Sequence, residues 1–207
     1  MDCEGRGKVA PRPITVKLTR GEKIGILIDA RRIAARRGEW HGEGWKGGLA
    51  GELVVRGVGL LGRQLRPIYL GLGGEYSTAK IVNRRIGHNV FIYDTTLYAD
   101  GDGGIDMHAY GMSVQIKTRG RDGDSLIRRL TAKKSFVPME STVAVFCEWN
   151  GNDPVKILGW HTMAHIMELC PLQKSPVADH WNLCVRDSEL QPIGSMITEL
   201  RAGHHEP

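Results

Sequence analysis

The sequence contains no long apolar run. No stretch approaches the roughly 18 to 20 consecutive apolar residues that a membrane helix needs. Residues 1–12 are polar and lack the apolar segment of a secretory signal. We therefore expect a soluble protein that acts in the cytoplasm and has no membrane partner.

Paired cysteines are also absent. The four cysteines are widely spaced and form no CxxC motif: Cys3, Cys147, Cys170 and Cys184. Cys147 lies in an apolar run, where a thiol behaves as a small hydrophobic group. This usage indicates a reducing compartment.

Two further binding motifs are incomplete. The glycines of Gly71-Leu72-Gly73-Gly74 do not form a phosphate loop, because no Lys-Ser or Lys-Thr follows them. His161 and His165 are four residues apart, as are His180 and Cys184, so a structural zinc site from these residues with Cys170 stays open as an alternative. No CxxC pair anchors such a site. The simpler interpretation is that these are packed or exposed side chains.

Basic residues outnumber acidic ones. The chain has 28 Lys and Arg against 23 Asp and Glu, which gives a net charge of +5 and suits a polyanionic partner such as DNA. Six basic residues follow the strand that is singled out below, and they are candidates for binding phosphates: Arg119, Arg121, Arg128, Arg129, Lys133 and Lys134. A charge run of this kind is also common on an ordinary solvated face.

The periodicity predicts helices first and strands later. Residues 1–13 are expected to form a flexible arm. Thr19 and Glu22 have the form of a capping box and predict a helix at about 20–37. A second helix is expected at about 47–61, on the spacing of its leucines and valines.

Five strands are expected from residue 88 onward. They begin with Val90 to Tyr93 and continue with 104–110, 113–118, 142–149 and 155–160. Gly111-Met112 allows a tight turn, and residues 150–154 are a strong turn signal. Thr162 is expected to cap a short helix at 162–169. We expect one α/β domain over 14–195 with a C-terminal tail at 196–207, and Trp149, Trp160 and Trp181 in its core.

The most informative segment joins Asp106 to Gln115 and Lys117. Side chains alternate along a strand, so Gln115 and Lys117 point to the same side. Asp106 joins them if its strand pairs antiparallel through the turn near Gly111. Carboxylate and amide oxygens suit a hard divalent ion such as Mg²⁺ or Mn²⁺, and the ammonium can orient a water and stabilise charge on a phosphate. The alternatives without chemistry are that Asp106 is a turn residue and that Lys117 is a solvated residue of a strand.

Asp followed on the next strand by Gln-x-Lys resembles the core of the PD-(D/E)XK nuclease superfamily. Gly103-Gly104-Ile105-Asp106 and Val114-Gln115-Ile116-Lys117 are similar to the branches in which Gln replaces the usual acid, such as Mrr-like and phage-encoded nucleases. The resemblance covers about 47–192 and extends more weakly to Val185 to Pro192. It implies a restriction-endonuclease-like fold, in which a central mixed sheet is flanked by helices.

The resemblance also implies a further Glu from a helix ahead of the sheet. Gly48 to Val55 looks like that helix, which makes Glu52 the fourth candidate, and Glu75 is a rival for the same role. Two departures from the family pattern matter. Gln115 is a weaker ligand than a carboxylate, and no Pro precedes Asp106.

These observations predict a metal-dependent DNA endonuclease. Its metal ligands would be Asp106, Gln115 and Glu52, and Lys117 would assist the attacking water. A homodimer is expected if both strands of a duplex are cut at once. Two alternatives stay open: a non-catalytic nucleic-acid-binding module on the same fold, and a structural or assembly protein of a virus particle.

Overall fold

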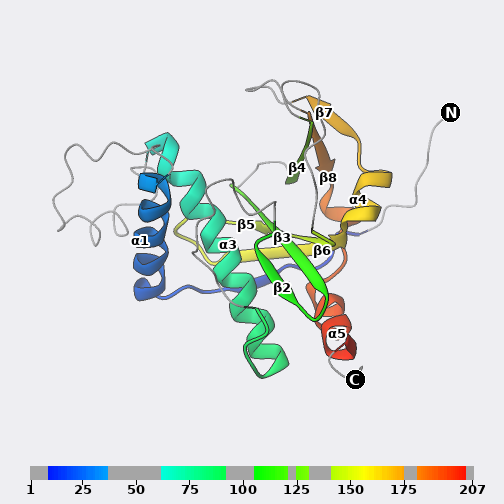
Figure 1. Ribbon diagram of the computed structural model, residues 1–207, viewed down its shortest axis with the longest axis horizontal. Coiled ribbons are helices and arrows are strands. Elements are labelled where there is room, and N and C mark those ends of the chain that lie inside the picture. The colour runs from blue at the N-terminus through cyan, green and yellow to red at the C-terminus, as the bar shows by residue number, and fades with distance from the viewer. Residues whose placement is uncertain are drawn as a thin grey trace.

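The computed structural model describes residues 9–36, 62–91, 105–120, 125–130, 141–174 and 181–203. These residues form a five-stranded sheet in the order β1-β6-β5-β3-β2 and a three-stranded sheet in the order β4-β8-β7 (Figure 1). The predicted α/β class, a mixed sheet flanked by helices, is confirmed. Among the described helices, none has the length and apolar character needed to cross a membrane.

The large sheet is mixed because one of its strand pairs is parallel. Its strands are β1 (Ile14–Val16), β2 (Met107–Ala109), β3 (Met112–Arg119), β5 (Val143–Glu148) and β6 (Val155–Thr162). β3 and β5 run parallel, and every other neighbouring pair is antiparallel.

The small sheet is antiparallel throughout. It consists of β4 (Ser125–Leu130), β7 (Leu172–Lys174) and β8 (Trp181–Val185). The helices are α1 (Arg20–Arg36), α3 (Gly62–Ile86), α4 (Met163–Leu169) and α5 (Ile193–Gly203), with a 3-10 turn η2 (Asp187–Glu189).

Two hairpins follow from short-range turn chemistry. Residues 150–154 connect β5 to β6 as predicted, with Asn150 Oδ1 accepting the N–H groups of Asn152 and Asp153 at 2.9 Å each. The β2–β3 turn lies one residue earlier than predicted. Its two central residues are Tyr110 and Gly111, both with positive φ (44° and 75°), and Met112 already belongs to β3.

The predicted capping box at the start of α1 is confirmed. The Thr19 N–H donates to Glu22 Oε2 at 2.7 Å, and the Glu22 N–H donates to Thr19 Oγ1 at 3.2 Å. The predicted helix at 20–37 corresponds to α1, and the predicted helix at 162–169 corresponds to α4. Thr162 caps α4, as expected, by accepting the His165 N–H.

The long helix α3 was not predicted. It contains Pro67 and the three glycines of the 71–74 segment, all of which are poor helix formers. The glycines are explained by packing. A Cβ on Gly73 would lie 2.0 Å from the Trp149 ring, and a Cβ on Gly74 would lie 1.9 Å from Thr118 Oγ1. The helix therefore approaches the sheet more closely than any larger residue would permit.

The large sheet has an apolar core on each face. Val114, Ile116, Val145 and Cys147 belong to the first core, with residues of α1, α3 and α5. Ala144, Phe146 and Leu158 belong to the second core, with residues of α4, β4 and β8. Trp149 and Trp160 are fully buried as predicted, whereas Trp181 is only half-buried.

Two boundary predictions are corrected. The expected C-terminal tail at 196–207 is wrong for residues 196–203, because these belong to α5 and bury Met196, Ile197 and Leu200 in the first core. Val90 and Phe91 are not in a strand. The predicted helix at 47–61, most of the N-terminal arm and Ile92-Tyr93 lie outside the described residues.

Candidate functional site

Gln115 and Lys117 point to the same face of β3. Val114 and Ile116 face the first core, so the two residues that alternate with them face the opposite side. Their register partners on β5, Ala144 and Phe146, belong to the second core. Both side chains are half-buried. The prediction that Gln115 and Lys117 share a face is confirmed.

Asp106 lies at the edge of β3 beside these two residues. Its backbone N–H donates to the Val114 carbonyl at 2.8 Å, which continues the β2–β3 ladder beyond Met107. Its carboxylate oxygen Oδ2 accepts the N–H of Ile116, the residue between Gln115 and Lys117. The structure therefore brings the three predicted residues to one short stretch of strand edge.

The helix carboxylate is less well placed. Glu52 lies outside the described residues. Its rival Glu75 is half-buried on α3, where the neighbouring Gly74 packs against Thr118. Burial raises the pKa of the Cys147 thiol to about 12, and the charge of Glu75 adds to this while a hydrogen bond with Thr78 opposes it. Glu75 thus lies toward the face of the sheet opposite to Gln115 and Lys117.

The donor set has the chemistry of a magnesium site but is small. Asp106 offers a carboxylate and Gln115 a neutral amide oxygen, and Mg²⁺ is commonly held by one or two carboxylates together with waters and substrate phosphates. No group of three or more His, Cys, Asp or Glu side chains in the described part of the chain is arranged to hold a metal ion. Glu52, the further carboxylate that the sequence offers, lies outside that part.

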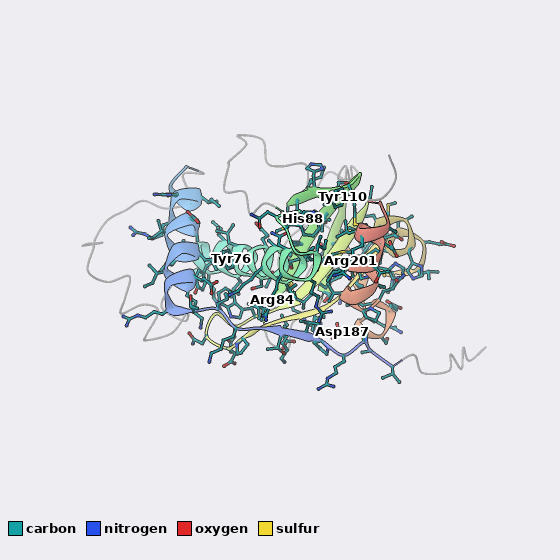
Figure 2. The ribbon with its side chains drawn as sticks, turned by 90° about the horizontal axis from the view of Figure 1, so that it is seen from below. Tyr76, Arg84, His88, Tyr110, Asp187 and Arg201 are labelled. Carbon is teal, nitrogen blue, oxygen red and sulfur yellow. The ribbon has the colours of Figure 1, made fainter. Side chains whose placement is uncertain are left out.

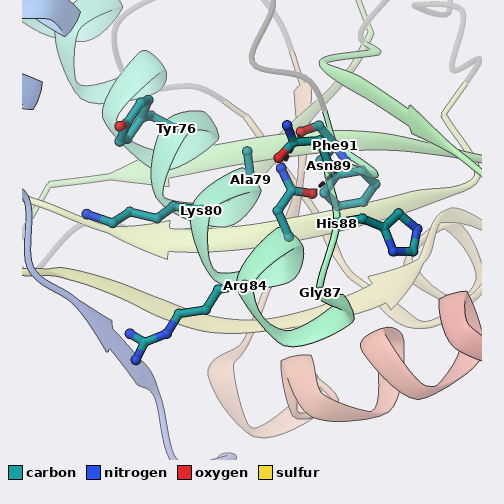
Figure 3. A pocket seen from close by; sticks show the side chains of 9 residues that line it. Tyr76, Ala79, Lys80, Arg84, Gly87, His88, Asn89 and Phe91 are labelled. Atoms are coloured by element: carbon teal, nitrogen blue, oxygen red, sulfur yellow. Dashed lines mark hydrogen bonds between the residues drawn. The ribbon is translucent and has the colours of Figure 1, made fainter.

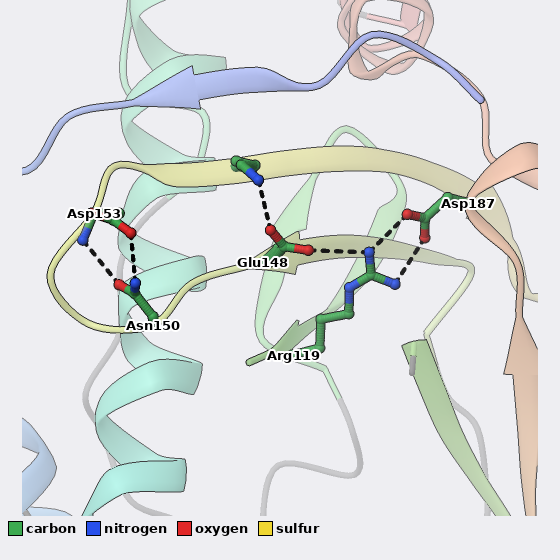
Figure 4. Close-up of polar contacts among 6 residues, drawn as sticks. Arg119, Glu148, Asn150, Asp153 and Asp187 are labelled. Atoms are coloured by element: carbon green, nitrogen blue, oxygen red, sulfur yellow. Dashed lines mark hydrogen bonds and ion pairs between the residues drawn. The ribbon is translucent and has the colours of Figure 1, made fainter. Parts of the chain in front are cut away.

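Arg119, which was predicted to contact phosphate, binds two carboxylates in the folded protein. Its guanidinium binds Asp187 in a bidentate pair, at 3.0 Å and 2.7 Å, and also contacts Glu148 Oε2 at 3.2 Å (Figure 4). Only 17% of its side chain is exposed. Burial alone would lower its pKa, but the two carboxylates raise it. The guanidinium is therefore engaged in joining β3, β5 and η2.

Glu148 connects this network to β6. Its second oxygen accepts from Lys156 Nζ at 2.8 Å. This ammonium, together with Arg119, lowers the pKa of the Glu148 carboxyl despite its partial burial. Sequence reasoning missed Asp187 as the partner of Arg119, because 68 positions separate the two residues and no local pattern connects them.

The other predicted phosphate contacts are not described by the structure. Arg121, Lys133 and Lys134 lie outside the described residues. The backbones of Arg128 and Arg129 belong to β4, which pairs with β8.

The alternative zinc site is not assembled in the described residues. The rings of His161 and His165 stack face to face, with centroids 3.5 Å apart and planes 2° from parallel. His161 Nδ1 accepts the Thr162 N–H at 2.9 Å, so this lone pair is directed at the backbone. No disulfide joins Cys147, Cys170 and Cys184 in the described part of the chain, and His180 lies outside it.

Comparison with protein-family models, with curated proteins and with solved structures found no match to this chain.

Proposed function

We propose that this protein is a metal-dependent endonuclease that hydrolyses DNA phosphodiester bonds. One observation carries the proposal: the Asp106 carboxylate meets the backbone of β3 at Ile116, between Gln115 and Lys117, which share one face of the strand. The residues that carry an anionic oxygen, an amide oxygen and an ammonium thereby lie on one short stretch of the β2–β3 pair. This combination suits metal-assisted hydrolysis of a phosphodiester.

Each residue has a separate role in the proposed reaction. Asp106 and Gln115 would hold Mg²⁺ or Mn²⁺, with Glu52 as a further oxygen donor, and the ion would neutralise charge on the phosphate and on the leaving oxygen. The Lys117 ammonium would position the attacking water and stabilise the charge that develops on the phosphoryl oxygens. The net charge of +5 would favour the phosphate backbone, and binding should weaken steeply with salt.

A second candidate function is a nucleic-acid-binding module without catalysis. The observation that favours it is that the same hydrogen bond also has a structural role. Asp106 Oδ2 accepts the Ile116 N–H at a point that β2 no longer covers. The described residues also offer few metal ligands. A site that has lost its metal ion but kept its fold would have both properties. Metal-dependent cleavage distinguishes the two functions.

The test is cleavage of supercoiled plasmid and of single-stranded DNA at low salt, with Mg²⁺, Mn²⁺ or EDTA. The variants are wild type, Lys117→Ala and the matched control Lys174→Ala, in which an exposed lysine of β7 is removed. We expect cleavage that needs the metal and falls by at least about 100-fold in Lys117→Ala alone, because losing one transition-state donor has that size of effect. Conversion to nicked or to linear plasmid would report whether one or two centres act together.

Equal unfolding midpoints of the three proteins in urea would show that the loss is chemical. No cleavage by the wild type with either metal, with DNA binding retained, would overturn the nuclease in favour of the binding module. Cleavage that survives Lys117→Ala unchanged would remove this strand edge as its centre.

A further inference from the structure

A second candidate site lies at the C-terminal end of α3. It is a cavity of about 570 Å³ between the last three turns of that helix and residues 87–91, and we call it the α3 pocket (Figure 3). Its volume is in the range of small-molecule binding sites. Its lining includes two cations, an imidazole and two aromatic side chains: Lys80, Arg84, His88, Tyr76 and Phe91.

The wall of the pocket is fixed by one asparagine. Asn83 Oδ1 accepts the N–H groups of Val90 and Phe91 at 2.9 Å and 2.8 Å, and Asn83 Nδ2 donates to the Phe91 carbonyl at 2.6 Å. Phe91 is 1% exposed, so it anchors this segment in the core. Gly87, with φ of 96°, ends the helix and lets the chain turn back. The pocket is therefore preformed rather than assembled by its ligand.

The positive charge of the pocket comes from Arg84, because Glu22 pairs with the Lys80 ammonium and also accepts from the Tyr76 hydroxyl. None of the described residues that line it is acidic. Lys80 and Arg84 are one helical turn apart and extend toward the same side (Figure 3). Lys80 Nζ binds Glu22 Oε1 at 2.7 Å, whereas Arg84 is exposed to solvent. An exposed guanidinium over a cavity favours a phosphate, which it can bind through two parallel hydrogen bonds.

A strained tyrosine is attached to this pocket. Tyr110 occupies the first central position of the two-residue β2–β3 turn with φ of 44°, where Asn, Asp or Gly is usual. Its hydroxyl forms a 2.7 Å hydrogen bond with His88 Nε2, and 40% of the residue is exposed (Figure 2). Backbone strain held by a specific contact is typical of functional sites.

We propose that the α3 pocket and Tyr110 together bind a single-stranded segment of nucleic acid. Arg84 would hold a phosphate, and an unpaired base would stack on the Tyr110 ring. In a duplex the face of the base is covered by its neighbours, so this stacking requires a single strand. The proposal rests on the proposed nuclease function for the identity of the polymer. Asp106 and Tyr110 flank the two ends of β2, four residues apart, which corresponds to roughly 13 Å of extended chain. Since α3 packs on the face of the sheet opposite to Gln115 and Lys117, one nucleic-acid strand would pass around the edge strand β2 to reach both sites.

The experiment measures binding without cleavage. Fluorescence anisotropy of a labelled oligothymidine and of a labelled duplex is recorded in EDTA at low salt for wild type, Arg84→Ala, Arg85→Ala, Tyr110→Ala and Tyr110→Phe. Arg85 is the matched control, because it is the exposed neighbour on the same helix and does not line the pocket. In further measurements, inorganic phosphate or adenosine monophosphate is added as a competitor of the labelled oligothymidine.

We expect Arg84→Ala to weaken oligothymidine binding by at least fivefold and Arg85→Ala by less than twofold. Tyr110→Ala should weaken it by about tenfold, in keeping with the loss of one stacked base, while Tyr110→Phe keeps the ring and stays within threefold. Equal losses in Arg84→Ala and Arg85→Ala would overturn the proposal in favour of general charge attraction. Displacement by inorganic phosphate as efficient as by the nucleotide, with Tyr110→Ala unaffected, would overturn it in favour of a pocket for free phosphate.

These outcomes are independent of the catalytic proposal. Loss of binding in Arg84→Ala with no cleavage by the wild type would keep the pocket and remove the nuclease. Cleavage that needs Lys117, with binding unaffected by Arg84→Ala and Tyr110→Ala, would keep the nuclease and remove the pocket.

Discussion

The Asp106 carboxylate accepts the N–H of Ile116 at the point where β2 no longer covers the edge of β3. A strand edge leaves backbone donors unsatisfied, and this side chain replaces the missing carbonyl of a neighbouring strand. Asp106 therefore has a structural role whether or not it binds a metal ion.

Substituting Asp106 in two ways separates the structural role from the chemical one. In Asp106→Asn the amide oxygen can still accept the Ile116 N–H, so the free energy of unfolding should change by less than about 1 kcal/mol. In Asp106→Ala the hydrogen bond to a charged group is lost, and the cost should be about 1.5–3 kcal/mol. Urea unfolding gives both values, and plasmid cleavage by Asp106→Asn should fall to background. Full cleavage by a stable Asp106→Asn would show that the carboxylate charge has no catalytic part.

Glu22 makes the stability of the protein dependent on pH below neutrality. Burial alone would raise its pKa, but the Lys80 ammonium and hydrogen bonds from Thr19 and Tyr76 outweigh it and lower the pKa from 4.5 to about 2. The carboxylate therefore stabilises the folded state fully above pH 5. This contribution, about 2 kcal/mol after allowance for solvent, is lost as the pH falls from 4.5 toward 2.

The comparison of wild type with Glu22→Gln isolates this contribution. Urea midpoints measured from pH 6 to pH 3 should fall for the wild type and converge with those of Glu22→Gln, because the variant has no carboxyl group at position 22 that could take up a proton. Parallel curves, with a constant difference across that window, would show that the Glu22 pKa is not lowered by folding.

The glycines of α3 offer a sharp packing test. Gly74→Ala should cost at least about 2 kcal/mol, because its Cβ would lie 1.9 Å from Thr118 Oγ1 and 3.4 Å from Cys147 Cβ. The matched control is Gly25→Ala in α1, where nothing lies within 4 Å of the new Cβ and the better helix former should add about 0.5–1 kcal/mol. Thermal or urea unfolding measures both. Similar effects at the two positions would contradict the close approach of α3 to the sheet.

The same glycines explain why α3 escaped prediction. Local propensity is unfavourable at Pro67 and at Gly71, Gly73 and Gly74, and the helix gains its stability from contacts with Trp149 and Thr118 that lie far along the chain. The helices α1 and α4 were predictable because their N-caps, Thr19 and Thr162, act on residues only three positions away. The short-range capping signals of these two helices were reliable, whereas the apolar run that starts at Val90 predicted a strand that Val90 and Phe91 do not form.

The candidate site divides along the same line. The common face of Gln115 and Lys117 follows from the two-residue period of a strand, and the meeting with Asp106 follows from a tight turn. The engagement of Arg119 by Asp187 could not be predicted, because it depends on how the small sheet is seated against the large one. The α3 pocket could not be predicted either, because no sequence pattern indicates that Asn83 accepts the N–H of Phe91.

The pairing of β1 with β6 sets an order on the folding of this chain during synthesis. Ile14 of β1 pairs with Ile157 of β6, so β1 leaves the ribosome long before its partner strand. At typical rates of translation the interval is on the order of ten seconds, which far exceeds the time in which the β5–β6 hairpin forms. Over that interval β6 is not yet present to pair with β1. Once β6 has formed, β1 pairs with its free edge, to which the intervening chain connects it. A nascent chain of this protein is thus exposed to pairing with other chains at β1 until β6 has been made.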